Sequence, residues 1–172
     1  MAWGRANLDT SVVVAKDGRH SGPQLEWTGE RYVTSVSGEI EFEHTHRYLF
    51  AMPFAESATV LDIASGEGYG SALLGSVAHR VIGIDLDENS IAHARPKYKN
   101  DNLSFLRGDC TRIPLSSDSF DLIVSFETLE HILDHLQFFN EISRVLRPDG
   151  VLVISTPDRV PYNDLMTAGP NP

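Results

Sequence analysis

The stretch that decides the fold is V-L-D-I-A-S-G-E-G-Y-G-S, residues 60–71. A short apolar run leads into a turn that holds Gly66, Gly68 and Gly70, and the residues after Ser71 favour a helix. Glycines let the backbone adopt positive φ and let a ligand approach closely, while a helix start presents unpaired N–H groups. The pattern therefore predicts a strand, a tight loop and a helix that together bind a nucleotide-like cofactor.

The glycine spacing separates two kinds of cofactor. The dinucleotide fingerprint G-x-G-x-x-G needs a third glycine where Ser71 stands. Asp62, at the end of the strand, would repel a diphosphate but attract an ammonium group. S-adenosylmethionine carries an amino group and a sulfonium and no phosphate. Residues 62–68 resemble the first motif of class I S-adenosylmethionine-dependent methyltransferases, D-x-G-x-G-x-G, with Ala64 at the first glycine position, where it limits positive φ.

Length and composition set the outer limits. A chain of 172 residues with 41% hydrophobic residues suits one domain with a packed core. A formal net charge of −10 argues against a nucleic-acid or anionic-membrane surface. We expect no membrane span and no metal site, because the sequence has no apolar run of about 18 residues and no zinc-type Cys/His spacing. The single cysteine, Cys110, is compatible with a reducing cytoplasm, which is the localisation we expect.

Apolar strands alternate with helices along the rest of the chain. This order predicts a doubly wound α/β fold, Rossmann-like, with a mostly parallel sheet covered on both faces. We expect Pro53 to kink or end the first helix, Pro96 to close the third, and 147–150 to form a turn. In the last helix we expect a buried side made of Leu136, Phe139, Ile142, Val145 and Leu146. The expected strands are 59–64, 80–85, 103–107, 120–125 and 151–155, and the expected helices are 39–55, 68–76, 88–94 and 134–146.

The domain boundary is placed before the first helix. We expect residues 1–38 to form a partly flexible N-terminal arm and residues 39–172 to form the S-adenosylmethionine-binding domain. Only 17 residues, four of them proline, follow Ser155. The resemblance to class I methyltransferases implies two further strands there, so we expect the sheet to be truncated after its fifth strand. An exposed fifth strand invites a homodimer through the sheet edge.

Ligands of open parallel sheets bind outside the carboxyl ends of the strands. The second strand ends at Asp85, 17 positions beyond Gly68, where a carboxylate can accept both hydroxyls of a ribose, or cap a helix instead. By resemblance, Asp109 receives the adenine amino group; alternatively it only forms a turn. The resemblance extends over residues 59–157 and places the methionine portion near Glu127. The candidate cofactor-binding residues are Asp62, Ala64, Gly66, Gly68, Asp85, Leu86, Asp109, Cys110, Ser125, Phe126 and Glu127.

The candidate catalytic residue is His131, which follows the fourth strand near the expected cleft. Methyl transfer to a hydroxyl needs a general base, and a histidine there can supply it, or simply cap or pack. Glu127 and Glu130 are rival candidates. Upstream polar residues could fold over the cofactor or contact an acceptor, or they could simply pack in a helix and form salt bridges. They resemble the leader of bacterial methyltransferases of sugar or cell-surface polysaccharide pathways. They are Arg31, Tyr32, His44, His46, Arg47 and Tyr48.

The sequence thus predicts S-adenosylmethionine-dependent methyl transfer to oxygen or nitrogen of a small-molecule or sugar-derived acceptor. The alternative is a truncated, non-catalytic module that binds the cofactor or a partner protein. A nicotinamide-dependent oxidoreductase is a third hypothesis, which the glycine spacing and Asp62 oppose.

Overall fold

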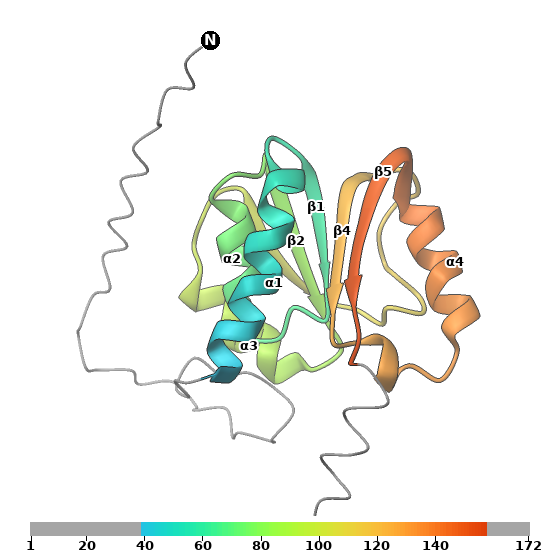
Figure 1. Cartoon of the computed structure of the whole chain (residues 1–172), viewed down its shortest axis with the longest axis horizontal. Coiled ribbons are helices and arrows are strands. Elements are labelled where there is room, and N and C mark those ends of the chain that lie inside the picture. Colours follow the sequence, from blue (N-terminus) through green and yellow to red (C-terminus); the bar gives the residue numbers. More distant parts are fainter. Residues whose placement is uncertain (1–38, 158–172) are drawn as a thin grey trace, which may run out of the picture.

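The chain forms one parallel sheet with helices on both faces (Figure 1). The computed structural model describes residues 39–157, so the predicted arm at 1–38 and the last residues of the predicted domain lie outside the described residues. In chain order the elements are α1 (Glu39–Ala55), β1 (Thr59–Ile63), α2 (Tyr69–Gly75), β2 (Arg80–Asp85), α3 (Glu88–Lys97), β3 (Leu103–Arg107), β4 (Phe120–Phe126), the 3₁₀ turn η1 (Leu129–His131), α4 (His135–Val145) and β5 (Leu146–Ser155).

The strand order is β3-β2-β1-β4-β5, and each neighbouring pair is parallel. The predicted doubly wound α/β fold is therefore confirmed. The chain order reverses between β1 and β4, and the crevice outside the carboxyl ends of these two strands is the expected ligand position in such a sheet.

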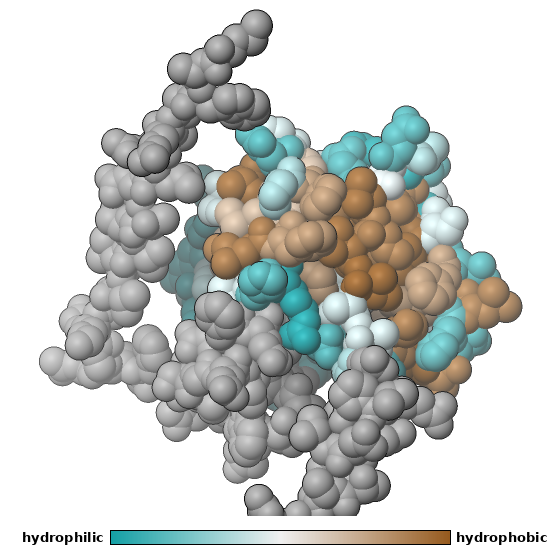
Figure 2. All heavy atoms as spheres, in the orientation of Figure 1, coloured by the Kyte–Doolittle hydropathy of each residue, from teal (hydrophilic) through white to brown (hydrophobic). Residues whose placement is uncertain are grey.

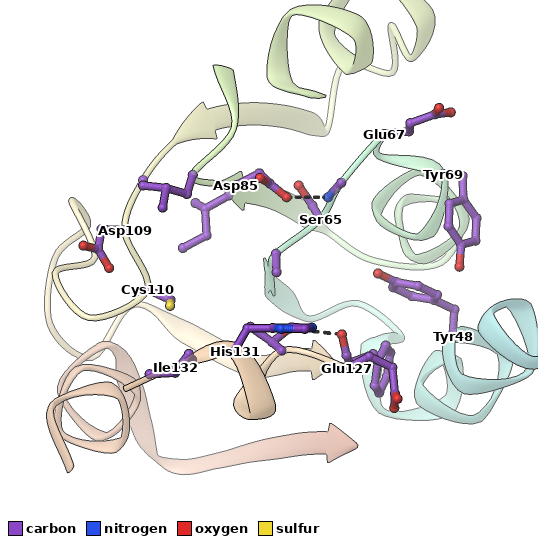
Figure 3. Close-up of a pocket in the computed structure, with 17 residues that line it drawn as sticks. Tyr48, Ser65, Glu67, Tyr69, Asp85, Asp109, Cys110, Glu127, His131 and Ile132 are labelled. Atoms are coloured by element: carbon purple, nitrogen blue, oxygen red, sulfur yellow. Dashed lines mark hydrogen bonds between the residues drawn. The ribbon is translucent and has the colours of Figure 1, made fainter. Parts of the chain in front are cut away.

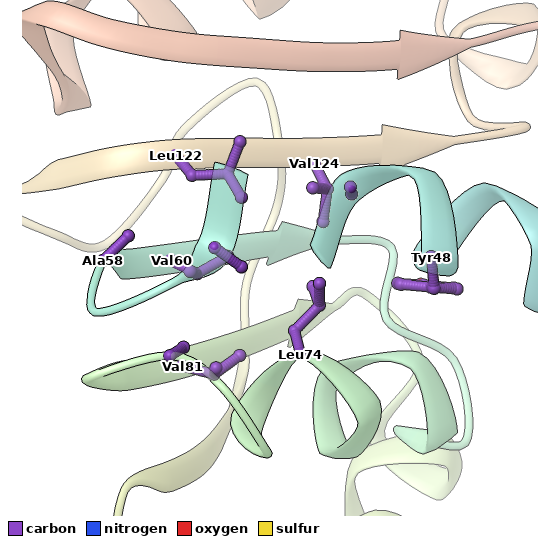
Figure 4. Packing of buried hydrophobic residues seen from close by; sticks show 10 residues of the cluster. Tyr48, Ala58, Val60, Leu74, Val81, Leu122 and Val124 are labelled. Carbon is purple, nitrogen blue, oxygen red and sulfur yellow. The ribbon is translucent and has the colours of Figure 1, made fainter. Parts of the chain in front are cut away.

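Alternation along the strands builds a separate core on each face of the sheet. Val60, Val81 and Leu122 pack with Leu74 of α2 and Tyr48 of α1 (Figure 4). The residues next to them in sequence, Leu61, Ile82 and Ile123, point to the opposite face, where they meet Phe138, Ile142 and Val145 of α4. Successive residues of a strand point to opposite faces of the sheet. A strand that is covered by helices on both faces therefore needs apolar residues at every position.

Two helices contain a proline in their last turn. α1 has the expected bounds, 39–55, with Pro53 inside it, whereas α3 continues past Pro96 to Lys97, beyond the expected end at Ala94. A proline at these positions removes one N–H donor and crowds the carbonyl four residues earlier, so the last turns need support from packing. Packing of the fully buried Ala51, Ala55 and Ala94 holds both last turns in place.

The predicted buried side of α4 is partly wrong. Phe138 is fully buried, whereas Leu136 and Phe139 are 74% and 40% exposed. The true buried stripe is Phe138, Ile142 and Val145, which are spaced by four and three residues. β5 also begins earlier than predicted, at Leu146, because the expected turn at 147–150 lies within the strand beside a register irregularity opposite Phe120–Leu122.

β3 and β5 are the two edge strands of the described sheet. Hydrophobic side chains gather on the face shown in Figure 2, over the strands and α1. Phe50 and Phe54 of α1 and Val151 of β5 are among the exposed large hydrophobic residues, at 62%, 46% and 39%. Within residues 39–157, no helix has both the length and the apolar character needed to cross a bilayer.

Candidate functional site

A cavity of about 390 Å³ lies at the carboxyl ends of β1, β2 and β4, which is a size typical of small-molecule sites (Figure 3). Its walls come from α1, the loop after β1, the ends of β2 and β4, and the turn after β3. They consist of Tyr48, Ala64, Ser65, Gly66, Glu67, Tyr69, Ile84, Asp85, Leu86, Gly108, Asp109, Cys110, Phe126, Glu127, Thr128, His131 and Ile132.

The loop between β1 and α2 brings backbone, rather than long side chains, to the cavity. Ala64, Gly66 and Gly68 have φ of 58°, 53° and 84°, so Ala64 adopts the left-handed conformation in spite of its side chain. A Cβ on Gly68 would lie 2.6 Å from the ring of Phe105, which explains the need for glycine there. A Cβ on Gly66 would meet no atom within 4 Å. The backbone at Gly66 is therefore open to a ligand.

Asp62 lies beneath this loop and is fully buried. Its carboxylate accepts a hydrogen bond from the hydroxyl of Ser71 at 2.5 Å and from that of Tyr48 at 3.2 Å. Burial raises the pKa of Asp62 to about 7, although the two hydroxyl donors favour the charged form. Burial and the neighbouring Asp62 also raise the pKa of Tyr48 well above its usual value. Tyr48, which is itself a wall residue, thus connects the cavity to Asp62.

Asp85 is held in place by backbone donors on both sides. The N–H of Gly66 donates to Oδ2 and the N–H of Asp87 donates to Oδ1, each at 2.8 Å. The first contact ties the end of β2 to the glycine loop. A carboxylate oxygen has two acceptor sites, so Asp85 retains acceptor capacity toward a ligand in the cavity.

Asp109 both forms a turn and lines the cavity. Its Oδ1 accepts hydrogen bonds from the side-chain hydroxyl and the backbone N–H of Thr111, at 2.7 and 2.8 Å, and these lower the pKa of Asp109. The turn closes with a bridge between Asp109 and Arg112. Burial raises the pKa of the neighbouring Cys110 thiol, which therefore stays protonated at neutral pH.

Glu127 and His131 form the wall beyond β4. Glu127 has a φ of 50° and accepts a hydrogen bond from the hydroxyl of Ser155 at 2.7 Å. His131 lies on η1 with its side chain 56% exposed, and its Nε2 is 3.9 Å from Glu130. Glu130 in turn accepts a hydrogen bond from Thr156 at 3.1 Å. The end of β5 thus meets the residues that follow β4 on one side of the cavity.

Nine of the predicted site residues line the cavity, His131 included: Ala64, Gly66, Asp85, Leu86, Asp109, Cys110, Phe126, Glu127 and His131. Asp62, Gly68 and Ser125 do not line it, and their contact with a cofactor stays a prediction. Ser65 was missed, although its position between Ala64 and Gly66 in the glycine loop could have indicated it. Tyr69 and Ile132 also line the cavity and were not predicted. Their only signal in the sequence is that each lies next to a predicted site residue or one of the loop glycines.

Comparison with known proteins identifies the family. The Methyltransferase domain family matches residues 61–154, which is more than half of the chain. The chain therefore belongs to the methyltransferase family, and S-adenosylmethionine is the cofactor that this membership implies.

Individual relatives agree with this assignment. A probable S-adenosylmethionine-dependent methyltransferase of Mycolicibacterium smegmatis is 38% identical over 141 residues, covering 81% of this chain and 54% of the relative. Phthiotriol/phenolphthiotriol dimycocerosates methyltransferase 1 of Mycobacterium ulcerans is 30% identical over 135 residues, covering 76% of this chain and 49% of the relative. A protein of Pyrococcus horikoshii with a known crystal structure superposes with a TM-score of 0.67 at 28% identity, covering 80% of this chain and 66% of that one. The chain spans about half the length of these curated relatives.

The cavity fits S-adenosylmethionine better than a phosphate-bearing cofactor. Among the described residues that line it, four are carboxylic acids (Glu67, Asp85, Asp109 and Glu127) and none is lysine or arginine. Such walls repel a diphosphate but suit hydroxyls, an ammonium and a sulfonium. The buried hydroxyl of Ser65 has no hydrogen-bond partner among the described residues. A buried polar group without a partner is costly, and a ligand in the cavity would supply one.

Proposed function

We propose that this protein binds S-adenosylmethionine in the cavity and transfers its methyl group to oxygen or nitrogen of a small-molecule or sugar-derived acceptor. The observation that carries the proposal is the acidic, phosphate-excluding wall around an open glycine loop in a chain of the methyltransferase family. The name of the Mycobacterium ulcerans relative specifies phthiotriol and phenolphthiotriol dimycocerosates, which supports a small-molecule acceptor over a macromolecule. The acidic net charge of −10 supports the same choice against nucleic acid.

The site residues divide by the part of the cofactor that they serve. We assign Asp85 to the ribose hydroxyls, with Leu86 beside it, and Asp109 with Cys110 to adenine. Gly66 offers open backbone, and Glu127 faces the methionine portion. We assign Asp62 an action through Tyr48, because Tyr48 lines the cavity, Asp62 does not, and the tyrosine hydroxyl donates to the Asp62 carboxylate.

The cofactor supplies a methyl group on a positively charged sulfur, which is activated for displacement. The protein then needs to orient the acceptor and to remove its proton. We assign that proton to His131, since its partly exposed ring lies at the cavity wall on the β4 side. Glu130, which accepts a hydrogen bond from Thr156, lies beside the histidine, with its Oε1 3.9 Å from Nε2 of His131.

Titration calorimetry with S-adenosylmethionine, S-adenosylhomocysteine and NADH tests the binding step. Micromolar binding of the first two, without binding of NADH, supports the proposal; binding of NADH alone overturns it. Transfer of labelled methyl groups to a panel of alcohols, amines and sugars tests the reaction. Binding without transfer to any acceptor favours the non-catalytic binding module.

We further propose a cytoplasmic enzyme that pairs through the edge of β5. Among residues 39–157 no strand pairs with the outer side of β5, and Val151 is 39% exposed; these two observations support a homodimer, since an unpaired strand side presents unsatisfied backbone groups. Sedimentation equilibrium tests this pairing: a monomer at all concentrations contradicts it.

A further inference from the structure

Three large apolar side chains lie on the surface beside the cavity. Leu133, Leu136 and Phe139 are 103%, 74% and 40% exposed. Leu136 and Phe139 are three positions apart and therefore share one face of α4. Single exposed apolar residues are ordinary, but several large ones gathered on a surface mark a binding site. We call these three residues the apolar strip.

The apolar strip begins at the cavity wall. Ile132 and His131 both line the cavity, and Figure 3 shows them on the wall that η1 forms. Leu133 follows Ile132 directly in the chain and precedes Asp134, the N-cap of α4. The wall beside the residue that we assign to proton removal therefore continues onto the surface as apolar side chains.

The segment that carries the apolar strip is held in place by polar contacts. The Asp134 carboxylate accepts from the N–H of Gln137 at 2.9 Å, and Nε2 of Gln137 donates to the carbonyl of Thr111 at 3.2 Å. An apolar residue just before an N-cap commonly packs against the fourth helical residue, which is Phe138 in α4. Leu133 occupies that place but is fully exposed, so it does not pack in this way. Its side chain is therefore available to a ligand.

The charges around the apolar strip oppose an anionic partner. The sequence has no lysine or arginine between Arg112 and Arg144, and the acids Glu130 and Asp134 flank Leu133. Such a surface repels phosphate groups and anionic membranes. A stable protein–protein interface involves about 20–30 residues on each side, whereas the strip offers only a few side chains. Its size and charge suit a single uncharged alkyl chain.

We propose that the apolar strip binds an alkyl chain of the methyl acceptor, so that the hydroxyl or amine end of the acceptor enters the cavity beside His131. The assignment rests on the proposed function and deepens it, because it names the acceptor class: a molecule with a long, uncharged alkyl chain. The chain covers side chains that otherwise face water. Burial of this apolar surface favours long acceptors over short ones.

Phe50 supplies a matched control. Its side chain is 62% exposed, and it belongs to α1, which packs on the opposite face of the sheet from α4. Phe50 is not among the residues that line the cavity. Phe50→Ser therefore removes an exposed apolar side chain that the proposal does not place against the acceptor.

The experiment measures the affinity of the primary alcohols butanol, hexanol, octanol and decanol for wild type, Leu133→Ser, Leu136→Ser and Phe50→Ser. NMR titrations of protein labelled in its leucine methyl groups are run with and without S-adenosylhomocysteine. In wild type, each added methylene should tighten binding about two- to fourfold. Leu133→Ser and Leu136→Ser should each weaken decanol about three- to tenfold and leave butanol within about twofold, because the short alcohol does not reach the strip. Phe50→Ser should keep the wild-type affinities.

Three results overturn the assignment. Wild-type affinities that do not depend on chain length would show that no alkyl chain binds, and a dependence kept in both strip variants would show that the chain binds elsewhere. Self-association of wild type that both strip variants abolish, with unchanged alcohol affinities, would assign the strip to a second copy of the chain. Thermal melts check that each variant folds. A failure of the proposed function is distinguishable, because wild type would then not bind S-adenosylhomocysteine, whereas a failure of this inference leaves that binding intact.

Discussion

The hydroxyl of Tyr48 on α1 lies 3.2 and 3.3 Å from the two carboxylate oxygens of Asp62 on β1, and both residues are buried. The tyrosine covers the carboxylate on the side of the cavity and packs edge-on against Tyr69 and Phe126. This contact couples the helix before the sheet, the first strand and the cavity wall. A change on either side of it should therefore alter the stability of the protein.

Asp62 should make the stability of the protein depend on pH. The folded protein keeps the Asp62 proton up to about pH 7, whereas the unfolded chain loses it near the ordinary pKa of 3.8. The folded state therefore binds more protons across this interval, and the free energy of unfolding falls as the pH rises through it, by about 1.4 kcal/mol per pH unit. Asp62→Asn removes this titration. The free energy of unfolding of Asp62→Asn minus that of wild type should therefore rise by about 2–3 kcal/mol from pH 5 to pH 8. Urea unfolding at both pH values measures this difference.

The exposed Asp101 supplies the control for that comparison. Asp101→Asn should differ from wild type by the same small amount at both pH values. A pH-independent difference between Asp62→Asn and wild type would mean that Asp62 is ionised in the folded protein at pH 5.

Gly70 should tolerate no side chain, because a Cβ there would overlap the ring of Tyr48. Gly70→Ala should cost about 1–3 kcal/mol of stability, as overpacking does, and should weaken cofactor binding by displacing Tyr48 from the wall. A Cβ on Gly75, in the same helix, would have its nearest neighbours at 3.9 and 4.0 Å. Gly75→Ala should be neutral or stabilising by about 0.5–1 kcal/mol. Urea denaturation of both variants checks this; equal effects would contradict the role of the Tyr48 contact.

Asp85 should matter for binding and Asp87 for stability. Asp85→Ala should weaken S-adenosylhomocysteine several-fold to a hundredfold, about 1–3 kcal/mol, through lost hydrogen bonds to ribose and to the glycine loop. Asp87 caps α3, since its carboxylate accepts from the N–H of Asn89 and the hydroxyl of Ser90. Asp87→Ala should cost about 1 kcal/mol of stability and leave the affinity within about twofold. Calorimetry and thermal melts separate the two effects, and unchanged affinity in Asp85→Ala would place the ribose elsewhere.

His131 should affect the reaction more than binding. His131→Asn should lower the rate of methyl transfer to a hydroxyl acceptor about 10²- to 10⁴-fold, the range for loss of a general base, with cofactor affinity within about threefold. His79, exposed just before β2 at the opposite end of the sheet, provides the control variant His79→Asn, which should keep the wild-type rate. Single-turnover kinetics with labelled cofactor measure both. Weaker cofactor binding with an unchanged single-turnover rate at saturating cofactor would assign His131 to cofactor binding instead.

The strands were predictable because they depend on local pattern. β2 and β3 have the expected bounds, because each is a short apolar run bounded by turn residues, and β2 is also buried on both faces. The glycine loop and the acids at the ends of β2 and β3 were predictable for the same reason, as a parallel sheet brings strand ends to one edge.

Other features depend on contacts distant in sequence. Leu136 and Phe139 are exposed because α4 packs on the sheet through the face that carries Phe138, Ile142 and Val145. The apolar residues of the helix alone do not show which face this is. The covering of Asp62 by Tyr48 joins residues 14 apart through the packing of α1 on α2, and the pairing of Arg47 with Glu127 spans 80 positions. Neither relationship leaves a periodic trace in the sequence. The left-handed Glu127 is likewise set by its two hydrogen bonds to Ser155.

The contacts of Ser155 with Glu127 and of Thr156 with Glu130 make the rim of the cavity and the border strand of the sheet one mechanical unit. Substitutions that fray this border therefore loosen both acids as well. A substitution at the end of β5 should therefore disturb the sheet edge and the placement of Glu127 and Glu130 together.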